Sequence, residues 1–233
     1  MSGKILAKIL QRLGDFIRIG VSTSEIDQLA ERLIRKEKVL PAFKGYNGFP
    51  ANICTSVNEE IVHGIPGHRR LVEGDIISLD LGINYKGYFS DAAITQAVGR
   101  VNSGIEKLIN VTQDALFEGI KEARMNNHLS DISYAIQNYV EKQGLSVVRQ
   151  FVGHGIGHNL HEDPQVPNYG LPHQGELLKC GMVFAIEPMV NMGTWDARIL
   201  DNGWTAVTKD GLPSAHFEHT VAITENGPEI LTN

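Results

Sequence analysis

Residues 75–98, DIISLDLGINYKGYFSDAAITQAV, decide the fold of this chain. In positions 75–82, Ser78 and Asp80 share one face and Leu79 and Leu81 share the other, a period of two that predicts a β-strand. The four residues 84–87, Asn-Tyr-Lys-Gly, predict a hairpin turn, and a second strand follows through position 98. The stretch is therefore expected to form two long antiparallel strands.

Two aspartates stand at matching positions of this hairpin. If the turn is centred between Tyr85 and Lys86, then Asp80 and Asp91 lie opposite each other on one face, with their Cβ atoms roughly 5 Å apart. Two carboxylates about 4 Å apart repel each other by roughly 4 kcal/mol at an effective dielectric of about 20. A shared cation would turn this repulsion into attraction. The alternative is a pair of solvated acids on an exposed face.

Helix signals precede and follow the hairpin in the same order. The spacing of apolar residues predicts a helix over 3–20, and Ser24 with Asp27 predicts the start of a second helix that runs to about Lys38. Two more helices are predicted after Asn102 or Ser103 and after Ser130, and strands over 53–62, 146–151, 182–191 and 216–224. Two helices followed by strands, twice over, predict an α+β fold with pseudo-symmetric halves, about 1–100 and 101–233, in a single domain.

The composition is that of an ordinary globular protein, with 42% hydrophobic and 21% charged residues. A net charge of −6 argues against a broad electrostatic grip on nucleic acid. No apolar run approaches the ~18 residues needed to span a membrane, and basic residues interrupt the apolar N-terminal segment, unlike a signal peptide. Cys54 and Cys180 suggest no disulfide framework, which favours reduced thiols and a cytoplasmic location.

Three residues beyond the hairpin are further candidate metal ligands. His154 lies in GHGIG, residues 153–157, where glycines let the backbone and a ligand approach closely. Glu187 lies within a predicted apolar strand, where an unpaired carboxylate is costly without a partner such as a metal. Glu218 is expected to share a strand face with His216. Together with the two aspartates, these residues offer four carboxylates and one imidazole, which suit a pair of divalent cations in metal-assisted hydrolysis.

Each of these residues also has a simpler interpretation. A histidine in a loop is most often hydrogen-bonded at the surface, and Glu218 could be an ordinary charge on an edge strand. His158 stands four residues after His154, but the glycines between them argue against a helix, so we interpret His158 as a structural or outer contact. His161, in HEDP at 161–164, is a better candidate for substrate contact.

Short motifs over most of the chain resemble those of type I methionine aminopeptidases, in metallopeptidase family M24. The ordered set is specific, although each motif is short. The resemblance implies the pita-bread fold, in which two related halves surround a curved antiparallel sheet covered by helices, with a dinuclear metal centre between them. The motifs are VHGIP at 62–66, SLD at 78–80, SD at 90–91, GHGIG at 153–157, HEDP at 161–164, IEPM at 186–189 and EHT at 218–220.

The resemblance also implies a role for individual residues. Glu187, His161 and His63 would be catalytic, with the two histidines also contacting substrate. Two divalent cations, drawn from Mn, Fe, Co or Zn, would be bridged by Asp91 and Glu218. The full ligand set implied is Asp80, Asp91, His154, Glu187 and Glu218. The pocket for a methionine side chain would be lined by Phe43, Tyr46, Phe49, Cys54 and Trp204. A thioether suits such aromatic and thiol neighbours.

Two residues depart from the family's common pattern. Leu160 stands where an aromatic residue is common, and Phe43 stands where some members have a cysteine. Neither position is among the implied metal ligands. Both are therefore expected to change the shape of the pocket rather than the metal chemistry.

The implied activity is removal of the N-terminal methionine from nascent proteins and peptides whose second residue is small. The implied partners are such chain termini, with no membrane and no specific nucleic acid, and the protein is expected to be a monomer. The basic residues Lys4, Lys8 and Arg12 could contact a ribosome transiently or simply face solvent. Two alternatives are another pita-bread peptidase, specific for Xaa-Pro and usually larger, and a non-catalytic pita-bread binding protein that would have lost metal ligands.

Overall fold

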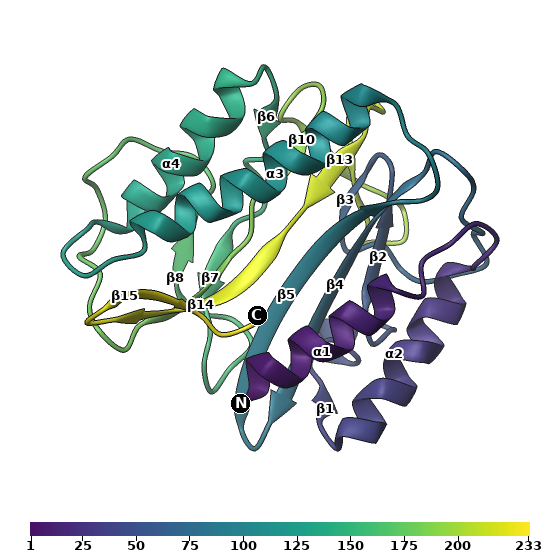
Figure 1. The fold of residues 1–233 in the computed structure, drawn as a ribbon, viewed down its shortest axis with the longest axis horizontal. Helices are drawn as coiled ribbons and strands as arrows, with labels where there is room; N and C mark the ends of the chain where they lie inside the picture. Colours follow the sequence, from purple (N-terminus) through teal and green to yellow (C-terminus); the bar gives the residue numbers. More distant parts are fainter.

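Four α-helices lie in two pairs against one large antiparallel sheet in the computed structural model, which describes residues 1–233 (Figure 1). Helices α1 (Ser2–Gly14) and α2 (Thr23–Glu37) form the first pair, and α3 (Ser103–Glu122) and α4 (Leu129–Lys142) form the second. Each pair packs over its own part of the sheet, so the expected repetition of helices and strands is present. The α+β fold class is confirmed.

The large sheet has nine strands in the order β1-β4-β5-β14-β9-β7-β8, with β2 beside β4 and β15 beside β14. Strands β4, β5 and β14 sweep across the middle of the molecule (Figure 1), so the centre of the sheet joins the early and late parts of the chain. The strands are β1 (Leu40–Pro41), β2 (Cys54–Val57), β4 (Ile76–Tyr85), β5 (Tyr88–Ala97), β7 (Gly153–Gly155), β8 (Glu162–Val166), β9 (Val183–Ile186), β14 (Glu218–Thr224) and β15 (Gly227–Ile230).

Two small sheets complete the fold. One has the order β13-β10-β6 and the other β11-β12-β3. Their strands are β6 (Ser146–Val147), β10 (Met189–Asn191), β13 (Ser214–His216), β3 (Glu60–Val62), β11 (Ala197–Ile199) and β12 (Ala206–Thr208). The predicted strand 182–191 is therefore two strands, β9 and β10, because Pro188 between them has no N–H to donate. The predicted strand 216–224 is also divided, which puts His216 and Glu218 on different strands.

The β4–β5 hairpin is present, but its register differs from the prediction. Tyr85 pairs with Tyr88, so the turn is centred on Lys86 and Gly87, which both have positive φ angles, 55° and 86°. A two-residue turn with positive φ at both positions matches the twist of the flanking strands. Asp80 therefore faces Ala93, and Asp91 faces Gly82. The predicted direct opposition was wrong by two residues, but an even shift keeps both aspartates on one face.

Three helix boundaries also differ from the prediction. Helix α1 ends at Gly14 rather than Gly20, because the chain turns there, although the following apolar residues still pack on the core. Ser22, not Ser24, caps α2: its hydroxyl accepts from the Glu25 N–H, and the Glu25 carboxylate accepts from the Ser22 N–H. Helix α4 begins at Leu129, since the Asp131 carboxylate accepts from the N–H of His128. Asn102, one of the two starts that the sequence left open, caps α3.

The buried apolar residues form two large clusters, one for each half. A cluster of 19 buried residues between Leu6 and Val98 lies under α1 and α2. A second cluster of 23 buried residues lies under α3 and α4. All of its members except Ile76 lie between residues 105 and 223. The sheet joins the two clusters, and the pocket described next lies where the halves meet.

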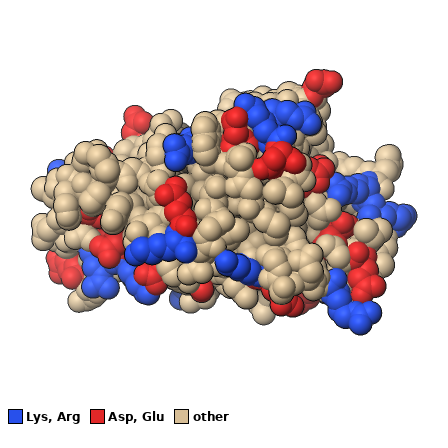
Figure 2. All heavy atoms as spheres, turned by 90° about the horizontal axis from the view of Figure 1, so that it is seen from above, with Lys and Arg blue, Asp and Glu red and all other residues tan.

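The surface carries both signs of charge. On the face shown in Figure 2, Lys and Arg side chains alternate with Asp and Glu side chains and form no broad field of one sign. Such a face offers no extended electrostatic footprint for nucleic acid. None of the four α-helices is both long and apolar enough to cross a membrane.

Candidate functional site

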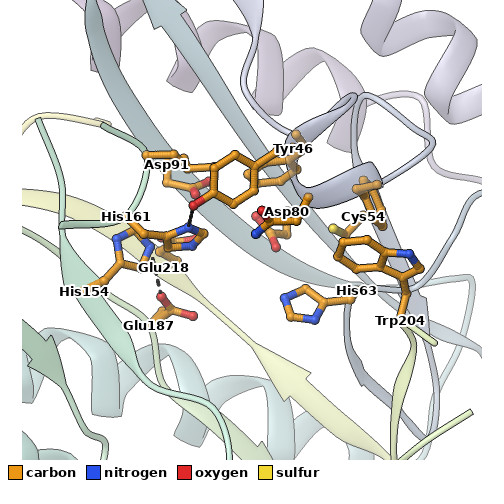
Figure 3. Close-up of a pocket in the computed structure, with 14 residues that line it drawn as sticks. Tyr46, Cys54, His63, Asp80, Asp91, His154, His161, Glu187, Trp204 and Glu218 are labelled. Atoms are coloured by element: carbon orange, nitrogen blue, oxygen red, sulfur yellow. Dashed lines mark hydrogen bonds and ion pairs between the residues drawn. The ribbon is translucent and has the colours of Figure 1, made fainter. Parts of the chain in front are cut away.

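A single cavity of about 210 Å³ gathers every site residue expected from the sequence. One residue of the wall, Asn47, was not expected from the sequence, whereas Leu160 lines the pocket whose shape it was expected to change. Asn47 could have been found, because it stands within the aromatic loop 43–49. The other lining residues are Phe43, Tyr46, Phe49, Cys54, His63, Asp80, Asp91, His154, His161, Glu187, Trp204 and Glu218 (Figure 3).

The five candidate metal ligands come from both halves of the chain. Asp80 and Asp91 are on β4 and β5, His154 is on β7, Glu218 begins β14, and Glu187 directly follows β9. Ligand atoms of Asp91, His154 and Glu218 lie within 4.8 Å of one another. Asp80 and Glu187 line the same cavity outside this trio. The sheet thus brings together residues that are far apart in sequence.

Two glycines let His154 reach this position. A Cβ atom at Gly153 would overlap the carbonyl oxygen of Ala185, and one at Gly155 would overlap the carbonyl oxygen of Asp163. These oxygens belong to the neighbouring strands β9 and β8. Close packing of backbones therefore requires glycine on both sides of His154, which agrees with the close approach expected from the sequence.

The carboxylates of the site are buried together. Asp91 is 4% exposed and Glu218 is 2% exposed. Burial raises the pKa of Asp91 to about 7. Burial first, and then the neighbouring carboxylates, raise the pKa values of Asp80, Glu187 and Glu218 well above their usual range. No lysine or arginine lines the cavity to offset these charges.

The unpaired oxygens of this cluster test whether a cation fits. Asp80 Oδ1 and Glu218 Oε1 are buried and have no hydrogen-bond partner. Buried polar atoms are normally satisfied, and each one left unpaired costs about 1–3 kcal/mol. Carboxylate oxygens with an imidazole nitrogen are a ligand set for divalent metals. The residues present therefore fit a bound divalent cation, which would satisfy the free oxygens and neutralise the repulsion.

The histidines of the cavity are held in their neutral form. Burial, followed by the proximity of His161, lowers the pKa values of His63 and His154 to about 4. Partial burial also lowers the pKa of His161. A neutral imidazole can act as a metal ligand or as a hydrogen-bond donor to substrate. His158, by contrast, lies against Tyr88 outside the cavity, at 4.6 Å between ring centres.

One end of the cavity is aromatic. Phe49 packs edge-on against Phe43 and Trp204, with ring centres 6.5 Å and 5.1 Å apart. Cys54 is buried beside them, and burial followed by the charge of Asp80 raises the pKa of its thiol. Leu160, 2% exposed, completes the wall. This end can hold an apolar side chain of moderate length next to the carboxylate cluster.

A buried histidine that the sequence did not assign to the site contacts Glu187. His216 Nε2 lies 3.7 Å from Glu187 Oε2, while His154 Nε2 lies 3.5 Å from Glu187 Oε1. Neither ring nitrogen of His216 has a hydrogen-bond partner. Burial lowers the pKa of His216 to about 3. Two neutral imidazoles therefore flank the Glu187 carboxylate, and no motif marked the second one.

Comparison with known proteins agrees with this geometry. The sequence profile of metallopeptidase family M24 matches residues 1–225. A relative from Bacillus subtilis, methionine aminopeptidase 1, is 54% identical over 231 residues, which cover 99% of this chain and 93% of that protein. The chain belongs to the methionine aminopeptidases of family M24. A methionine aminopeptidase from Clostridium perfringens is also 54% identical, with the same coverage.

Solved structures place the fold among the methionine aminopeptidases as well. The enzyme from Thermotoga maritima superimposes with a TM-score of 0.98 at 46% identity, covering all of this chain and 94% of that one. The expected pita-bread fold is thereby confirmed. A prolidase from Pyrococcus furiosus has a TM-score of 0.81 at 23% identity and shares the fold alone. The relatives at 46–54% identity are methionine aminopeptidases and do not favour the Xaa-Pro alternative.

Proposed function

We propose that this methionine aminopeptidase removes the N-terminal methionine from peptides and nascent chains whose second residue is small. One observation carries the proposal: the aromatic end of the cavity adjoins the buried carboxylates and His154. A methionine side chain would fill the aromatic end, where Cys54 and three aromatic rings suit a flexible thioether. Its peptide bond would then lie beside the metal ligands.

The proposed metal centre uses Asp80, Asp91, His154, Glu187 and Glu218. We propose two divalent cations, because five ligands with four carboxylates exceed what one small cation normally takes from protein. Asp91 and Glu218 would hold the cations together with His154, whose ligand atom lies within 4.8 Å of theirs. Bound cations supply a water molecule of lowered pKa and polarise the scissile carbonyl group.

Three residues have proposed roles in moving protons and holding the substrate. Glu187 takes a proton from the attacking water and passes it to the leaving amine, as a general base and then a general acid. His161 donates a hydrogen bond to the carbonyl oxygen as negative charge develops there. His63 holds the substrate backbone near the cleaved bond. Its ring packs edge-on against Phe151, with ring centres 5.6 Å apart.

Release of methionine tests the proposal. The cation-loaded protein is expected to release methionine from Met-Ala-Ser and to leave an Xaa-Pro peptide intact. His161→Ala should lower kcat about 100-fold or more, since it removes an oxyanion donor, without lowering the bound metal. Asp91→Ala should lower both activity and metal content, measured by elemental analysis. Full activity in either variant would refute the assigned roles, and preference for the Xaa-Pro peptide would refute the function.

The setting of the enzyme is part of the same proposal. Both cysteines are free thiols, which suits a reducing compartment such as the cytoplasm. We propose that residues 1–233 act as one catalytic unit and as a monomer, since a single chain supplies every site residue. A ribosome contact through Lys4, Lys8 and Arg12 stays a prediction. Lys8 is already engaged with Glu37, at 2.8 Å.

A further inference from the structure

The hydroxyl group of Tyr46 is bonded to the ring of His161. Tyr46 Oη lies 2.7 Å from His161 Nδ1, and the two ring centres are 5.1 Å apart. Figure 3 shows the phenol reaching over the cavity to the imidazole. A wall residue that served only to contact a methionine side chain would not need this polar bond. The bond therefore points to a second role for Tyr46.

The backbone around Tyr46 fixes the hydroxyl in place. The turn is closed by hydrogen bonds from the Gly45 N–H to the Phe49 carbonyl oxygen, 2.8 Å, and from the Phe49 N–H to the Tyr46 carbonyl oxygen, 2.9 Å. Gly45 and Gly48 have φ angles of 88° and 87°, which glycine adopts without strain. The turn thus presents the phenol from a closed, defined backbone.

The direction of the hydrogen bond decides what His161 offers to a substrate. A neutral imidazole has one N–H donor and one acceptor nitrogen. A phenol hydroxyl is a stronger donor than the N–H of a neutral imidazole, so Tyr46 donates and Nδ1 accepts. The ring proton must then be on Nε2. In the opposite tautomer, Nε2 would present a lone pair, which repels a developing oxyanion.

We propose that Tyr46 is a positioning residue that holds His161 in the tautomer with the proton on Nε2. His161 is then ready to donate to the carbonyl oxygen without first moving a proton or turning its ring. The inference rests on the proposed role of His161 in methionine release. Preorganised donors act mainly in the transition state, so loss of the Tyr46 hydroxyl should affect kcat more than KM.

The tautomer can be measured without any catalysis. In protein labelled with ¹⁵N-histidine and free of metal, His161 is assigned from the signals lost in His161→Ala. We expect Nδ1 to give an unprotonated signal and Nε2 a protonated one. In Tyr46→Phe both signals should move toward the average of two exchanging tautomers. A proton on Nδ1 in the wild type, or unchanged signals in Tyr46→Phe, would overturn the proposal.

Kinetics separate a positioning role from a wall of the methionine pocket. With Met-Ala-Ser, Tyr46→Phe should lower kcat about tenfold and change KM by less than about twofold. Tyr134→Phe, on the exposed face of α4, is the matched control and should leave both constants unchanged. A higher KM with an unchanged kcat would show that Tyr46 serves only as a wall, against the proposal.

A double-mutant comparison tests whether Tyr46 acts through His161. In a His161→Ala background, Tyr46→Phe should have almost no further effect on kcat, because the partner is gone. Losses that simply multiply would contradict the proposal. If the wild-type protein releases no methionine at all, the proposed function fails, and the ¹⁵N signals still decide the tautomer by themselves.

Discussion

The carboxylates of the cavity repel one another when no cation is bound between them. Four carboxylates share a buried space with no lysine or arginine, and two of their oxygens have no partner. A fold that only needed stability would place apolar residues there. The cluster therefore resembles other functional sites, where local destabilisation is retained for the sake of activity.

Glu218→Gln should reveal this repulsion by having opposite effects on stability and activity. The pKa of Glu218 in the folded protein is raised above 4.5. Its negative charge therefore opposes folding at pH values above about 4.5, and this cost grows until the pH reaches the folded pKa. In metal-free protein at pH 8, we expect the variant to be more stable by about 1–2 kcal/mol, while activity is lost. The gain should shrink as the pH falls toward 4.5, as measured by urea unfolding.

Glu225→Gln is the control for that experiment. Glu225 is exposed in the turn between β14 and β15, so its replacement should change neither stability nor activity. If Glu218→Gln lowered the stability of the metal-free protein at pH 8, the carboxylate would be paired in some way that the structure does not show.

The strands determine how accurately these residues meet. Strand β7 has only three residues, and two of them are the glycines beside His154. Because β8 and β9 approach it so closely, the backbone of His154 is fixed by contacts between strands, and its Nδ1 lies 2.8 Å from the carbonyl oxygen of Gly155. A strand of three residues has no neighbouring strand residues that could shift to relieve a distortion at His154.

Gly153→Ala should therefore damage both the fold and the metal site. The new Cβ would press on the Ala185 carbonyl group of β9, and we expect a loss of about 1–3 kcal/mol in the free energy of unfolding. Metal affinity should fall as His154 moves. Gly67→Ala is the matched control, because its nearest heavy atom would be 4.0 Å away. Identical urea midpoints for the two variants would contradict this account.

Local patterns were sufficient to predict most elements but not their ends. The alternation in β4 and the turn residues predicted the hairpin, because each signal lies within a few positions of the next. The register was missed, since residues 84–87 allow two turn centres and only the positive φ angles at Lys86 and Gly87 select one. Ser22 and Ser24 both resemble a helix cap, and Glu25, three residues after Ser22, completes the capping box only with Ser22, a local signal that the prediction missed.

More of the site was predicted than local patterns alone allow. The ordered motifs implied which residues form the site, and the fold brings those residues together. The sequence could not predict which residues of different motifs contact each other. The bond between Tyr46 and His161 joins residues separated by 115 positions, and the placement of His216 beside Glu187 depends on strands from two sheets. Such neighbours follow from how distant segments of the chain pack together, within one half or between the two, which no short segment of sequence records.

At the scale of the whole molecule, the proposed metal ligands come from both halves of the chain. Asp80 and Asp91 belong to the half that contains the first cluster, and His154, Glu187 and Glu218 belong to the half that contains the second. A cation held by both sets would link the halves directly. Its removal should then weaken the structure as a whole and not only the cavity.

Chelation tests this link. At a cation concentration 100 times Kd, binding stabilises the folded state by about 2.7 kcal/mol, which corresponds to about 5–10 °C for a chain of this size. Calorimetry of the protein with MnCl₂ and with EDTA should show that difference in one transition. Glu218→Gln should abolish it. Equal midpoints for the wild type in both conditions would show that no cation joins the halves.

The register of the β4–β5 hairpin limits how this enzyme can change in length during evolution. Inserting one residue within 81–85 or 88–90 would turn one aspartate to the opposite side of the sheet and abolish metal binding at once. An insertion at the tip, between Lys86 and Gly87, would only enlarge a loop that faces solvent. Natural insertions and deletions among its descendants should therefore collect at the tip and be absent from the strands, because only those at the tip preserve metal binding and activity.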